Sequence, residues 1–483
     1  MKKINIFSPK QYYPIRVMQF GEGNFLRGFI DYGIDLANEL CGFNGGIVII
    51  KPRPGNLEKI QKQDGVYTVL VRGIKNGMVY EEKRVITCIQ KMLCAYEDYN
   101  AFMDIAKIDS LEFIVSNTTE AGIIYDAQDK FTDSPPKTYP AKLTKFLYGR
   151  FEHYHGQADK GLVILPLELS DSNGDTLKQY VLAYTELWQL NSKFSDWLEN
   201  CNMFVNTLVD RIVTGYPSDA AVLMQKWGYE DKQIVACEPF SLWIIGDKRI
   251  AKRLPISTDL FKIKFTDDLV KYKEQKVRIL NGAHTAIALA TYLSGKNYIK
   301  ECMDDKVLRK FIEDIVIQEI VPTINMPDDQ ASTFAKLVFE RFDNPFIKHE
   351  LLSIALNSVA KWRVRILPTI KDIYCQTGEL PIRLMFSFAA LIKFYRSVVW
   401  GDGFLIGKRA GEEFKIADNA EVLDFFQQIS GKETNQYVKL VVENSNLWGE
   451  DLNAFPQFGM IVENQLLAIE KYGITACIKE MLT

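Results

Sequence analysis

The sequence has few of the residues and segments that mark metal-rich, secreted or membrane-spanning proteins. Its 483 residues include only four histidines and eight cysteines, and no two cysteines form a C-x-x-C pair. Scattered cysteines argue against a zinc ribbon or a disulfide framework, so we expect reduced thiols and no metal site. The N-terminus lacks the apolar core of a signal peptide, and no apolar run approaches the roughly 18 residues that span a bilayer. These absences predict a cytoplasmic protein that does not insert into a membrane.

An excess of charge of one sign is also missing. The net charge is −3, and no basic tail or cluster is present that would attract nucleic acid. Apolar residues make up 47% of the chain and charged residues 25%, which is ordinary for a globular protein. The chain is too long for one hydrophobic core, so we expect two or more domains.

The two parts of the chain differ in their hydrophobic patterns. Apolar segments of strand length alternate with helical segments in the first part, and the predicted strands are 15–20, 45–50, 66–72, 84–89, 112–117 and 161–166. This alternation predicts an α/β fold with a mostly parallel, doubly wound sheet. Helical patterns dominate later, at 267–293, 306–320, 328–341, 347–364, 381–395 and 420–428. We therefore expect one domain over residues 1–250 and a mainly α-helical domain over residues 251–483.

A glycine turn follows the first predicted strand. Gly21 and Gly23 occupy the first two glycine positions of the pattern G-x-G-x-x-G, whereas Leu26 stands at the third. A turn between a strand and a helix brings backbone N–H groups and the helix dipole to a phosphate. A plain turn is the alternative, but the place of this turn in an α/β domain favours a Rossmann-like dinucleotide site.

Two later segments should lie at the same edge of the sheet. The second strand is followed by Lys51 and Arg53 instead of an acidic residue, which favours a phosphate-bearing ribose or a different way of holding the ribose. Thr118, Thr119 and Glu120 follow another strand, where small polar groups would line the ligand crevice. The alternative for these three residues is a capped helix start.

The segment 276–285 carries Lys276, Asn281 and His284. At about 100° per residue, Asn281 lies roughly 140° and His284 roughly 80° around a helix from Lys276, so the three share one side. An amine that exchanges a proton, an amide that holds an oxygen and an imidazole that orients a hydroxyl suit alcohol–carbonyl chemistry without a metal. The alternative is a solvated amphipathic helix with an incidental histidine.

Several motifs in order resemble the mannitol dehydrogenase family over nearly the whole chain. They are Gly21-x-Gly23-x-Phe25-x-Arg27, Asn173-Gly174, Val209-Asp210-Arg211-Ile212, Lys276-x4-Asn281-x2-His284 and Arg341-Phe342-x-Asn344-Pro345. The resemblance implies a metal-independent oxidoreductase that uses NAD, so that Lys51 and Arg53 would not mark an NADP site. It implies that Lys276 is the general acid and base, assisted by Asn281, His284 and Asn173. The cofactor-binding residues would be Phe20, Gly21, Gly23, Asn24, Phe25, Arg27, Lys51, Arg53, Thr118, Thr119 and Glu120.

Within the family, segments 19–27, 51–56 and 361–365 are most similar to members that reduce keto sugar acids. Polyol-specific members usually carry C-D-N where this chain has Leu167-Glu168-Leu169. A sugar-acid substrate has a carboxylate, which arginine binds in a bidentate way. We therefore nominate Arg365 and Lys361 for that carboxylate, with Asn344 and His349 beside them. A reductase of an isomeric sugar acid and a polyol dehydrogenase are the alternatives, and the sequence makes no prediction about oligomeric state.

Overall fold

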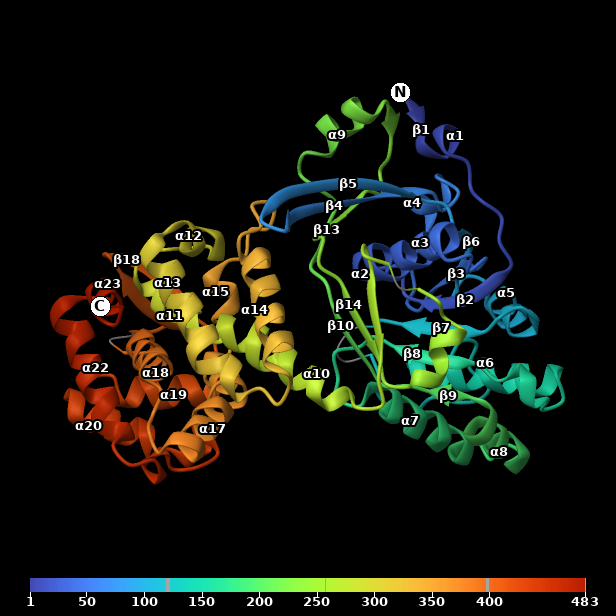
Figure 1. The fold of residues 1–483 in the computed structure, drawn as a ribbon. Coiled ribbons are helices and arrows are strands. Elements are labelled where there is room, and N and C mark those ends of the chain that lie inside the picture. The colour runs from blue at the N-terminus through green and yellow to red at the C-terminus, as the bar shows by residue number, and fades with distance from the viewer. Residues whose placement is uncertain (119–121, 257, 397–398, 483) are drawn as a thin grey trace. The chain divides into compact units, whose positions relative to one another are not determined.

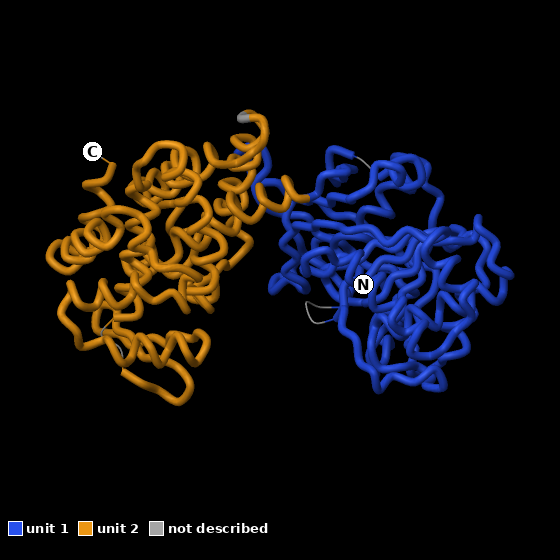
Figure 2. Tube along the Cα trace, turned by 90° about the horizontal axis from the view of Figure 1, so that it is seen from below, with its two compact units in different colours: residues 1–269 blue, residues 270–483 orange. Residues whose placement is uncertain are grey.

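The computed structural model describes residues 1–118, 122–256, 258–396 and 399–482. The chain forms two compact units, residues 1–269 and residues 270–483 (Figure 2). The sequence pattern placed the boundary after residue 250. Strand β15 (Lys262–Phe265) pairs in parallel with β14 (Leu242–Ile245), which keeps the chain in the first unit beyond that point.

The first unit is built on a six-stranded parallel sheet with the strand order β6-β3-β2-β7-β8-β9 (Figure 1). The strands are β2 (Ile15–Phe20), β3 (Gly46–Lys51), β6 (Ile89–Cys94), β7 (Phe113–Ser116), β8 (Val163–Pro166) and β9 (Met203–Phe204). Successive residues of β3 alternate between two cores, with Ile47 and Ile49 in one and Val48 and Ile50 in the other. A strand buried on both faces must be apolar at every position, so the prediction of a doubly wound sheet is confirmed.

Helices connect these parallel strands and cover the sheet. After β2 the chain continues through α2 (Asn24–Leu26), a π-helical turn η1 (Arg27–Asp31) and α3 (Tyr32–Leu40). The other main helices of this unit are α5 (Tyr99–Asp104), α6 (Tyr139–His153), α7 (Asn173–Leu187), α8 (Ser192–Cys201) and α9 (Ala220–Trp227).

A second sheet in this unit differs from the prediction. Strands β4 (Tyr67–Lys75) and β5 (Met78–Ile86) form an antiparallel hairpin, and β4 also pairs with β13 (Val235–Cys237), which pairs with β11 (Val213–Gly215). The hairpin turns at Asn76 and Gly77, which both have positive φ, as a type I′ hairpin turn requires. The prediction of one strand over 84–89 is wrong, because β5 ends at Ile86 and β6 begins at Ile89. A third sheet contains β10 (Thr207–Asp210), β14 and β15.

The second unit is mainly helical. Its longer helices are α11 (Ala283–Leu293), α13 (Lys306–Asp314), α14 (Asp328–Phe342), α17 (Leu367–Thr377), α18 (Ile382–Phe394), α19 (Ala420–Ile429), α20 (Thr434–Val442) and α22 (Phe458–Tyr472). Helices α10 (Leu269–Gln275), η5 (Lys276–Gly282) and α11 form a continuous helical run, and η5 is a π-helix. None of the helices in the described part of the chain has the length and apolar character that a membrane crossing requires.

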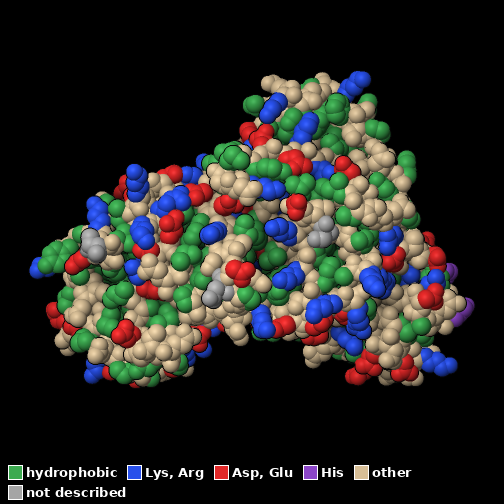
Figure 3. Space-filling model, viewed as in Figure 1, with side chains coloured by type: hydrophobic (Ala, Val, Ile, Leu, Met, Phe, Trp, Pro, Cys, Tyr) green, Lys and Arg blue, Asp and Glu red, His purple; other side chains and the backbone are tan. Residues whose placement is uncertain are grey.

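Two features of the second unit were not predicted. The expected helix over 347–364 is divided into α15 (Leu351–Ile354) and α16 (Ser358–Arg365), because Asn357 between them has a φ of 52°. A small antiparallel sheet of β16 (Val399–Trp400), β17 (Leu405–Arg409) and β18 (Glu412–Ile416) lies among the helices. On the visible face of each unit, acidic and basic side chains are interspersed (Figure 3).

Candidate functional site

The glycine turn lies at the carboxyl end of β2. Gly21 has a φ of 122°, and its N–H donates to the carbonyl of Ile50 at 2.9 Å. A Cβ atom at Gly21 would lie 2.8 Å from Cδ1 of Leu26, whereas one at Gly23 would meet nothing within 4 Å. Gly21 is therefore required by the backbone, and Gly23 leaves open space at the start of the helix. This arrangement fits a pyrophosphate group.

The side chains around the turn mainly support it. Phe20 is fully buried, and Phe25 stacks on Phe29 with ring centroids 5.0 Å apart. Arg27 is also buried, and its Nη2 donates to Oδ1 of the exposed Asn24 at 2.7 Å. Phe20 and Arg27 thus support the turn from the protein interior. Their direct contact with a cofactor stays a prediction.

An ion pair bears on whether the basic residues after β3 could bind a ribose phosphate. Nζ of Lys51 contacts Oε1 of Glu22, the residue between the two glycines. The Lys51 side chain is only 15% exposed. Its charge is therefore compensated by a carboxylate at the place where a ribose 2′-phosphate would have to bind, which argues against NADP. Arg53 is exposed.

A pocket of about 320 Å³ opens beside the turn, at the carboxyl ends of β3, β6 and β7. Pro52, Arg53 and Tyr96 line it from the loops after β3 and β6, and Thr118 lines it from the loop after β7. Its place at this edge of a parallel sheet is where open α/β sheets bind nucleotides. Thr119 and Glu120, predicted to bind the cofactor, lie outside the described residues.

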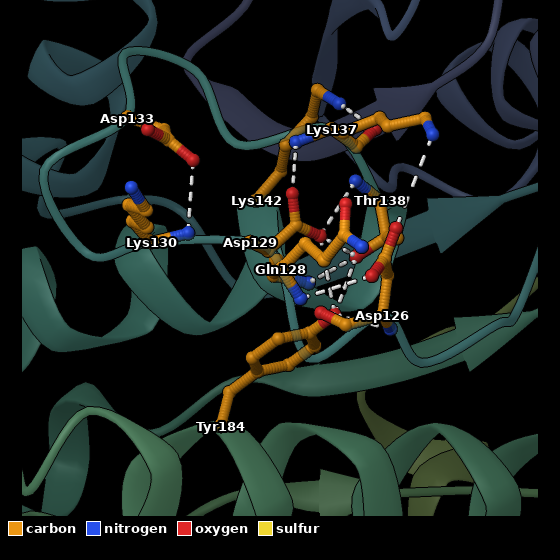
Figure 4. Close-up of polar contacts among 10 residues, drawn as sticks. Asp126, Gln128, Asp129, Lys130, Asp133, Lys137, Thr138, Lys142 and Tyr184 are labelled. Atoms are coloured by element: carbon orange, nitrogen blue, oxygen red, sulfur yellow. Dashed lines mark hydrogen bonds and ion pairs between the residues drawn. The ribbon is translucent and has the colours of Figure 1, made fainter.

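The outer wall of this pocket is a polar network that was not predicted from the sequence (Figure 4). Asp129 accepts hydrogen bonds from the Thr138 hydroxyl at 2.7 Å and from the Tyr184 hydroxyl at 3.1 Å. Nζ of Lys142 donates to the carbonyl of Lys137 at 2.6 Å, and burial lowers the pKa of Lys142 to about 8. Lys137, Thr138 and Lys142 all line the pocket. These residues come together only because α6 packs beside the loop after β7.

Thr118 is engaged by a buried acid. Its backbone N–H and its hydroxyl both donate to Oε1 of Glu168, at 2.9 and 2.8 Å, and the Ser116 hydroxyl donates to Oε2 at 3.0 Å. Burial raises the pKa of the Glu168 carboxyl, while these hydrogen bonds lower it. Glu168 therefore connects the loop after β8, in which it lies, to the loop after β7 through these hydrogen bonds.

Asn173, predicted to act as a donor to the substrate oxygen, is engaged by the surrounding backbone. The side chain is 1% exposed. Its Nδ2 donates to the carbonyls of Pro166 and Glu168 at 3.0 and 2.9 Å, and its Oδ1 accepts from the N–H of Thr207 at 3.0 Å. Both amide hydrogens are thus used by the backbone, and Asn173 shapes the loop after β8, while its role as a donor to the substrate oxygen stays a prediction.

The second unit holds the lysine, asparagine and histidine on η5 and α11. Lys276, Asn281 and His284 are all half-buried. In a π-helix each hydrogen bond joins residues five apart, so Asn281 comes closer to the side of Lys276 than the α-helical step would place it. We still expect Lys276, Asn281 and His284 to share one side of the helical run, although the backbone from Lys276 to Asn281 is a π-helix and not an α-helix. Such π-helical turns occur frequently at functional sites.

His284 is held as a neutral imidazole. Burial lowers its pKa well below the usual value, and His349, Arg341 and Arg365 lower it further. Its ring lies edge-to-face with the ring of His349, with centroids 4.7 Å apart. A hydrogen bond with the backbone of Leu280 engages one ring nitrogen, while Nε2 is buried and meets no partner among the described residues. Nε2 can therefore accept a hydrogen bond from a substrate hydroxyl.

Two cations, Arg365 near His284 and Lys361 near Arg365, have no carboxylate hydrogen-bond partner in the described chain. Nη1 of Arg365 donates to the Thr285 hydroxyl at 3.2 Å, and Nζ of Lys361 donates to the carbonyl of Ile354 at 3.0 Å. Burial lowers the pKa of both groups. Arg365 also lowers the pKa of Lys361, whereas the carboxylate of Asp418 raises it. Two cations on one helix that repel each other are suited to an anionic ligand.

The two remaining residues that were predicted to bind the substrate, His349 and Asn344, have different surroundings. His349 belongs to this cluster through its ring contact with His284, and burial together with Arg341 lowers its pKa. Asn344 is only 2% exposed, and its Oδ1 accepts from the N–H of Phe346 at 2.9 Å. Asn344 therefore shapes the turn after α14, and its contact with a substrate stays a prediction. Arg341 was missed, although it belongs to the motif that contains Asn344.

Together, a Rossmann-type domain with a glycine turn and a helical domain with a lysine–asparagine–histidine set define a two-domain dehydrogenase architecture. A model of the mannitol dehydrogenase Rossmann domain matches residues 15–258, and one of the mannitol dehydrogenase C-terminal domain matches residues 268–470. The chain belongs to the mannitol dehydrogenase family.

Known relatives match nearly the whole chain. The altronate oxidoreductase of Yersinia pestis bv. Antiqua (strain Nepal516) is 42% identical over 480 residues, which are 97% of each chain. That of Escherichia coli O7:K1 (strain IAI39 / ExPEC) is 41% identical over 483 residues, or 98% of each chain.

Two solved structures share the fold. Pseudomonas fluorescens mannitol 2-dehydrogenase, in a ternary complex with NAD and D-mannitol, has a TM-score of 0.69 at 21% identity and covers 100% of this chain and 99% of its own. A substrate-free D-sorbitol dehydrogenase has a TM-score of 0.81 at 17% identity and covers 99% of this chain and 100% of its own.

Proposed function

We propose that this protein is an NAD-dependent altronate oxidoreductase that interconverts D-altronate and D-tagaturonate. The observation that carries the proposal is the pair of cations Lys361 and Arg365, of which Arg365 lies near His284 and Lys361 lies near Arg365. The similarity to altronate oxidoreductases over nearly the full length supports the same substrate class. We also propose a cytoplasmic location, because the reaction would draw on the NADH pool of the cell.

The first unit fits NAD. The turn at Gly21 and Gly23 would hold the pyrophosphate, and the pocket lined by Arg53, Tyr96 and Thr118 would hold the adenosine end. The Lys51–Glu22 ion pair favours NAD over NADP, because a 2′-phosphate would have to displace a carboxylate. When bound, NADH supplies the hydride for reduction of a carbonyl, and NAD accepts it in the reverse direction.

Residues of the second unit handle the proton and orient the substrate. We assign proton transfer to the amine of Lys276, which as an ammonium would give its proton to the oxygen of the reduced carbonyl. The Asn281 amide would donate a hydrogen bond to the same oxygen as negative charge develops there. Nε2 of neutral His284 would accept a hydrogen bond from a neighbouring hydroxyl and so hold the sugar chain in place.

The carboxylate end of the substrate would bind to Arg365 and Lys361. A neutral polyol offers these two cations no counter-charge, whereas the carboxylate of altronate offers two oxygens to the planar guanidinium. This difference favours a sugar acid over mannitol, and fructuronate, an isomeric keto acid, is the competitor that the substrate test must separate.

The deciding experiment is a substrate panel. Purified protein is mixed with NADH or NADPH and with tagaturonate, fructuronate or fructose, and cofactor oxidation is followed by absorbance. We expect the highest kcat/KM with tagaturonate and NADH. A preference for fructose would overturn the assignment of a sugar acid, and a preference for fructuronate would overturn the choice between the two keto acids.

A further inference from the structure

A carboxylate from a distant loop caps the helix that carries Lys361 and Arg365. Helix α16 begins after Asn357, whose side chain makes no capping hydrogen bond. The N–H of Val359 donates to Oδ2 of Asp418 at 3.4 Å, and the N–H of Asn357 donates to the carbonyl next to it in sequence, that of Ala417, at 3.3 Å. The first N–H groups of a helix have no partner within the helix, so they need acceptors of this kind. A negative charge is favoured at this end because the helix dipole is positive there.

Asp418 is itself held in place by two further hydrogen bonds. It lies in the loop between β18 and α19, where its Oδ1 accepts from the N–H of Asn419 at 2.8 Å. Its Oδ2 also accepts from the hydroxyl of Tyr395 at 2.5 Å. Tyr395 is fully buried at the end of α18, and its ring stacks on Phe426 of α19 with the centroids 4.4 Å apart. The carboxylate therefore joins α16 to α18 and α19.

The side chain of Lys361 reaches back to the same end of α16. Its Nζ donates to the carbonyl of Ile354, the last residue of α15, at 3.0 Å. Side chains of a helix lean toward its N-terminus, and this hydrogen bond places the amine before the first residue of α16. Burial and Arg365 lower the pKa of Lys361, whereas Asp418 raises it. Asp418 thus favours the charged amine, which a carboxylate ligand requires.

Asp418 acts on Lys361 without occupying it. The interaction is one of charge, and no hydrogen bond or ion pair joins the two side chains in the described part of the chain. The oxygens of Asp418 are used by Val359, Tyr395 and Asn419. An ammonium has three hydrogens, so Lys361 keeps hydrogens for a ligand beyond the one that Ile354 accepts. With Arg365 also present, the three charged groups together stay net positive.

We propose that Asp418 is a positioning residue for the substrate: it caps the start of α16 and supplies the negative charge beside which Lys361 and Arg365 can bind one carboxylate. This inference rests on the proposed function in one respect, namely that these two cations bind the carboxylate of the sugar acid.

The test follows KM and kcat for tagaturonate, with NADH at saturation, from neutral to alkaline pH in the full-length protein. In the wild type, KM should rise about tenfold as the Lys361 amine loses its proton, the change expected for one hydrogen bond to a charged group. In Asp418→Asn this rise should begin at lower pH, because the charge that favours the ammonium is removed while a capping oxygen is kept. The kcat profile, which reports Lys276, should stay in place.

Lys361→Arg separates an effect on charge from a merely structural role. A guanidinium keeps its charge at alkaline pH, so the rise of KM should disappear in this variant. Adding Asp418→Asn to Lys361→Arg should then change KM little at any pH. A residue with a merely structural role would raise KM equally in both backgrounds.

Asp418→Ala removes the capping oxygen together with the charge. Its KM should exceed that of Asp418→Asn already at neutral pH, because the N–H of Val359 loses its acceptor. Asp424→Asn is the matched control, since Asp424 is an exposed acid of α19. It should keep the wild-type KM profile.

The outcomes separate this inference from the proposed function. A rise of KM that persists in Lys361→Arg shows that the lysine does not bind the substrate carboxylate, and the proposed function then loses its carboxylate site. A rise that disappears in Lys361→Arg but stays in place in Asp418→Asn leaves that site standing and refutes the role of Asp418. A wild type without the rise also refutes that role. Equal KM values for Asp418→Ala and Asp418→Asn at neutral pH refute the positioning of α16.

Discussion

Replacing Arg365 by glutamine should remove much of the preference for a substrate that carries a carboxylate. The guanidinium is half-buried, its hydrogen-bond partner is the neutral hydroxyl of Thr285, and burial lowers its pKa. A hydrogen bond to a charged group contributes about 1.5–3 kcal/mol. Since each 1.4 kcal/mol corresponds to a factor of ten, kcat/KM for tagaturonate should fall about 10- to 150-fold.

The assay measures kcat and KM for tagaturonate and for fructose, a neutral ketose, with NADH at saturation. The Arg365→Gln variant should lose kcat/KM for tagaturonate and change little for fructose. Arg363→Gln is the matched control, since Arg363 is an exposed residue of the same helix α16. An equal loss for both substrates, or an equal loss in Arg363→Gln, would refute the reasoning. Stability should not fall, because burial already penalises the charge of Arg365 in the folded protein.

Three further predictions follow from other parts of the molecule. Lys276→Ala should lower kcat by about 10²- to 10⁴-fold while NADH still binds, measured by single-turnover kinetics and fluorescence titration, and substantial turnover would contradict the role of the lysine. Asn173→Ala should lower the free energy of unfolding by about 1–3 kcal/mol in urea, because it leaves buried backbone groups without partners. An unchanged stability together with a large fall in kcat would instead restore a catalytic role for Asn173. Glu22→Gln should raise kcat/KM with NADPH relative to NADH, because it releases Lys51 from its ion pair, and an unchanged ratio would show that this pair does not set the cofactor preference.

The main sheet could be predicted because its strands are buried on both faces. Residues such as Ile47, Val48, Ile49 and Ile50 must all be apolar, and a run of that kind is visible in the sequence. The hairpin of β4 and β5 has similar residues, but its partners are set by long-range pairing with β13. Hydrophobicity alone does not distinguish a strand of the parallel sheet from one that joins another sheet.

The candidate site was predictable in part. Lys276, Asn281 and His284 are close in sequence, and any regular helical backbone brings them near one another. The neutral state of His284 was not predictable, because it results from burial and from cations on other helices. The hydrogen bonds of Asn173 were not predictable, because its partners, such as Thr207, are distant in sequence.

The sequence by itself determined the kinds of groups that this protein brings to its chemistry: a glycine turn after an apolar strand, and an amine, an amide and an imidazole within nine residues. Local spacing is enough for this, since both features depend on backbone geometry over a few residues. Only the tertiary structure decided the charge state and the accessibility of those groups. Two such features are the carboxylate that Lys51 faces and the lack of a hydrogen-bond partner for Nε2 of His284 among the described residues. Both are set by burial and by neighbours from distant parts of the chain. Electrostatic free energies depend on these distances and on exclusion of water, and neither can be read from the order of residues.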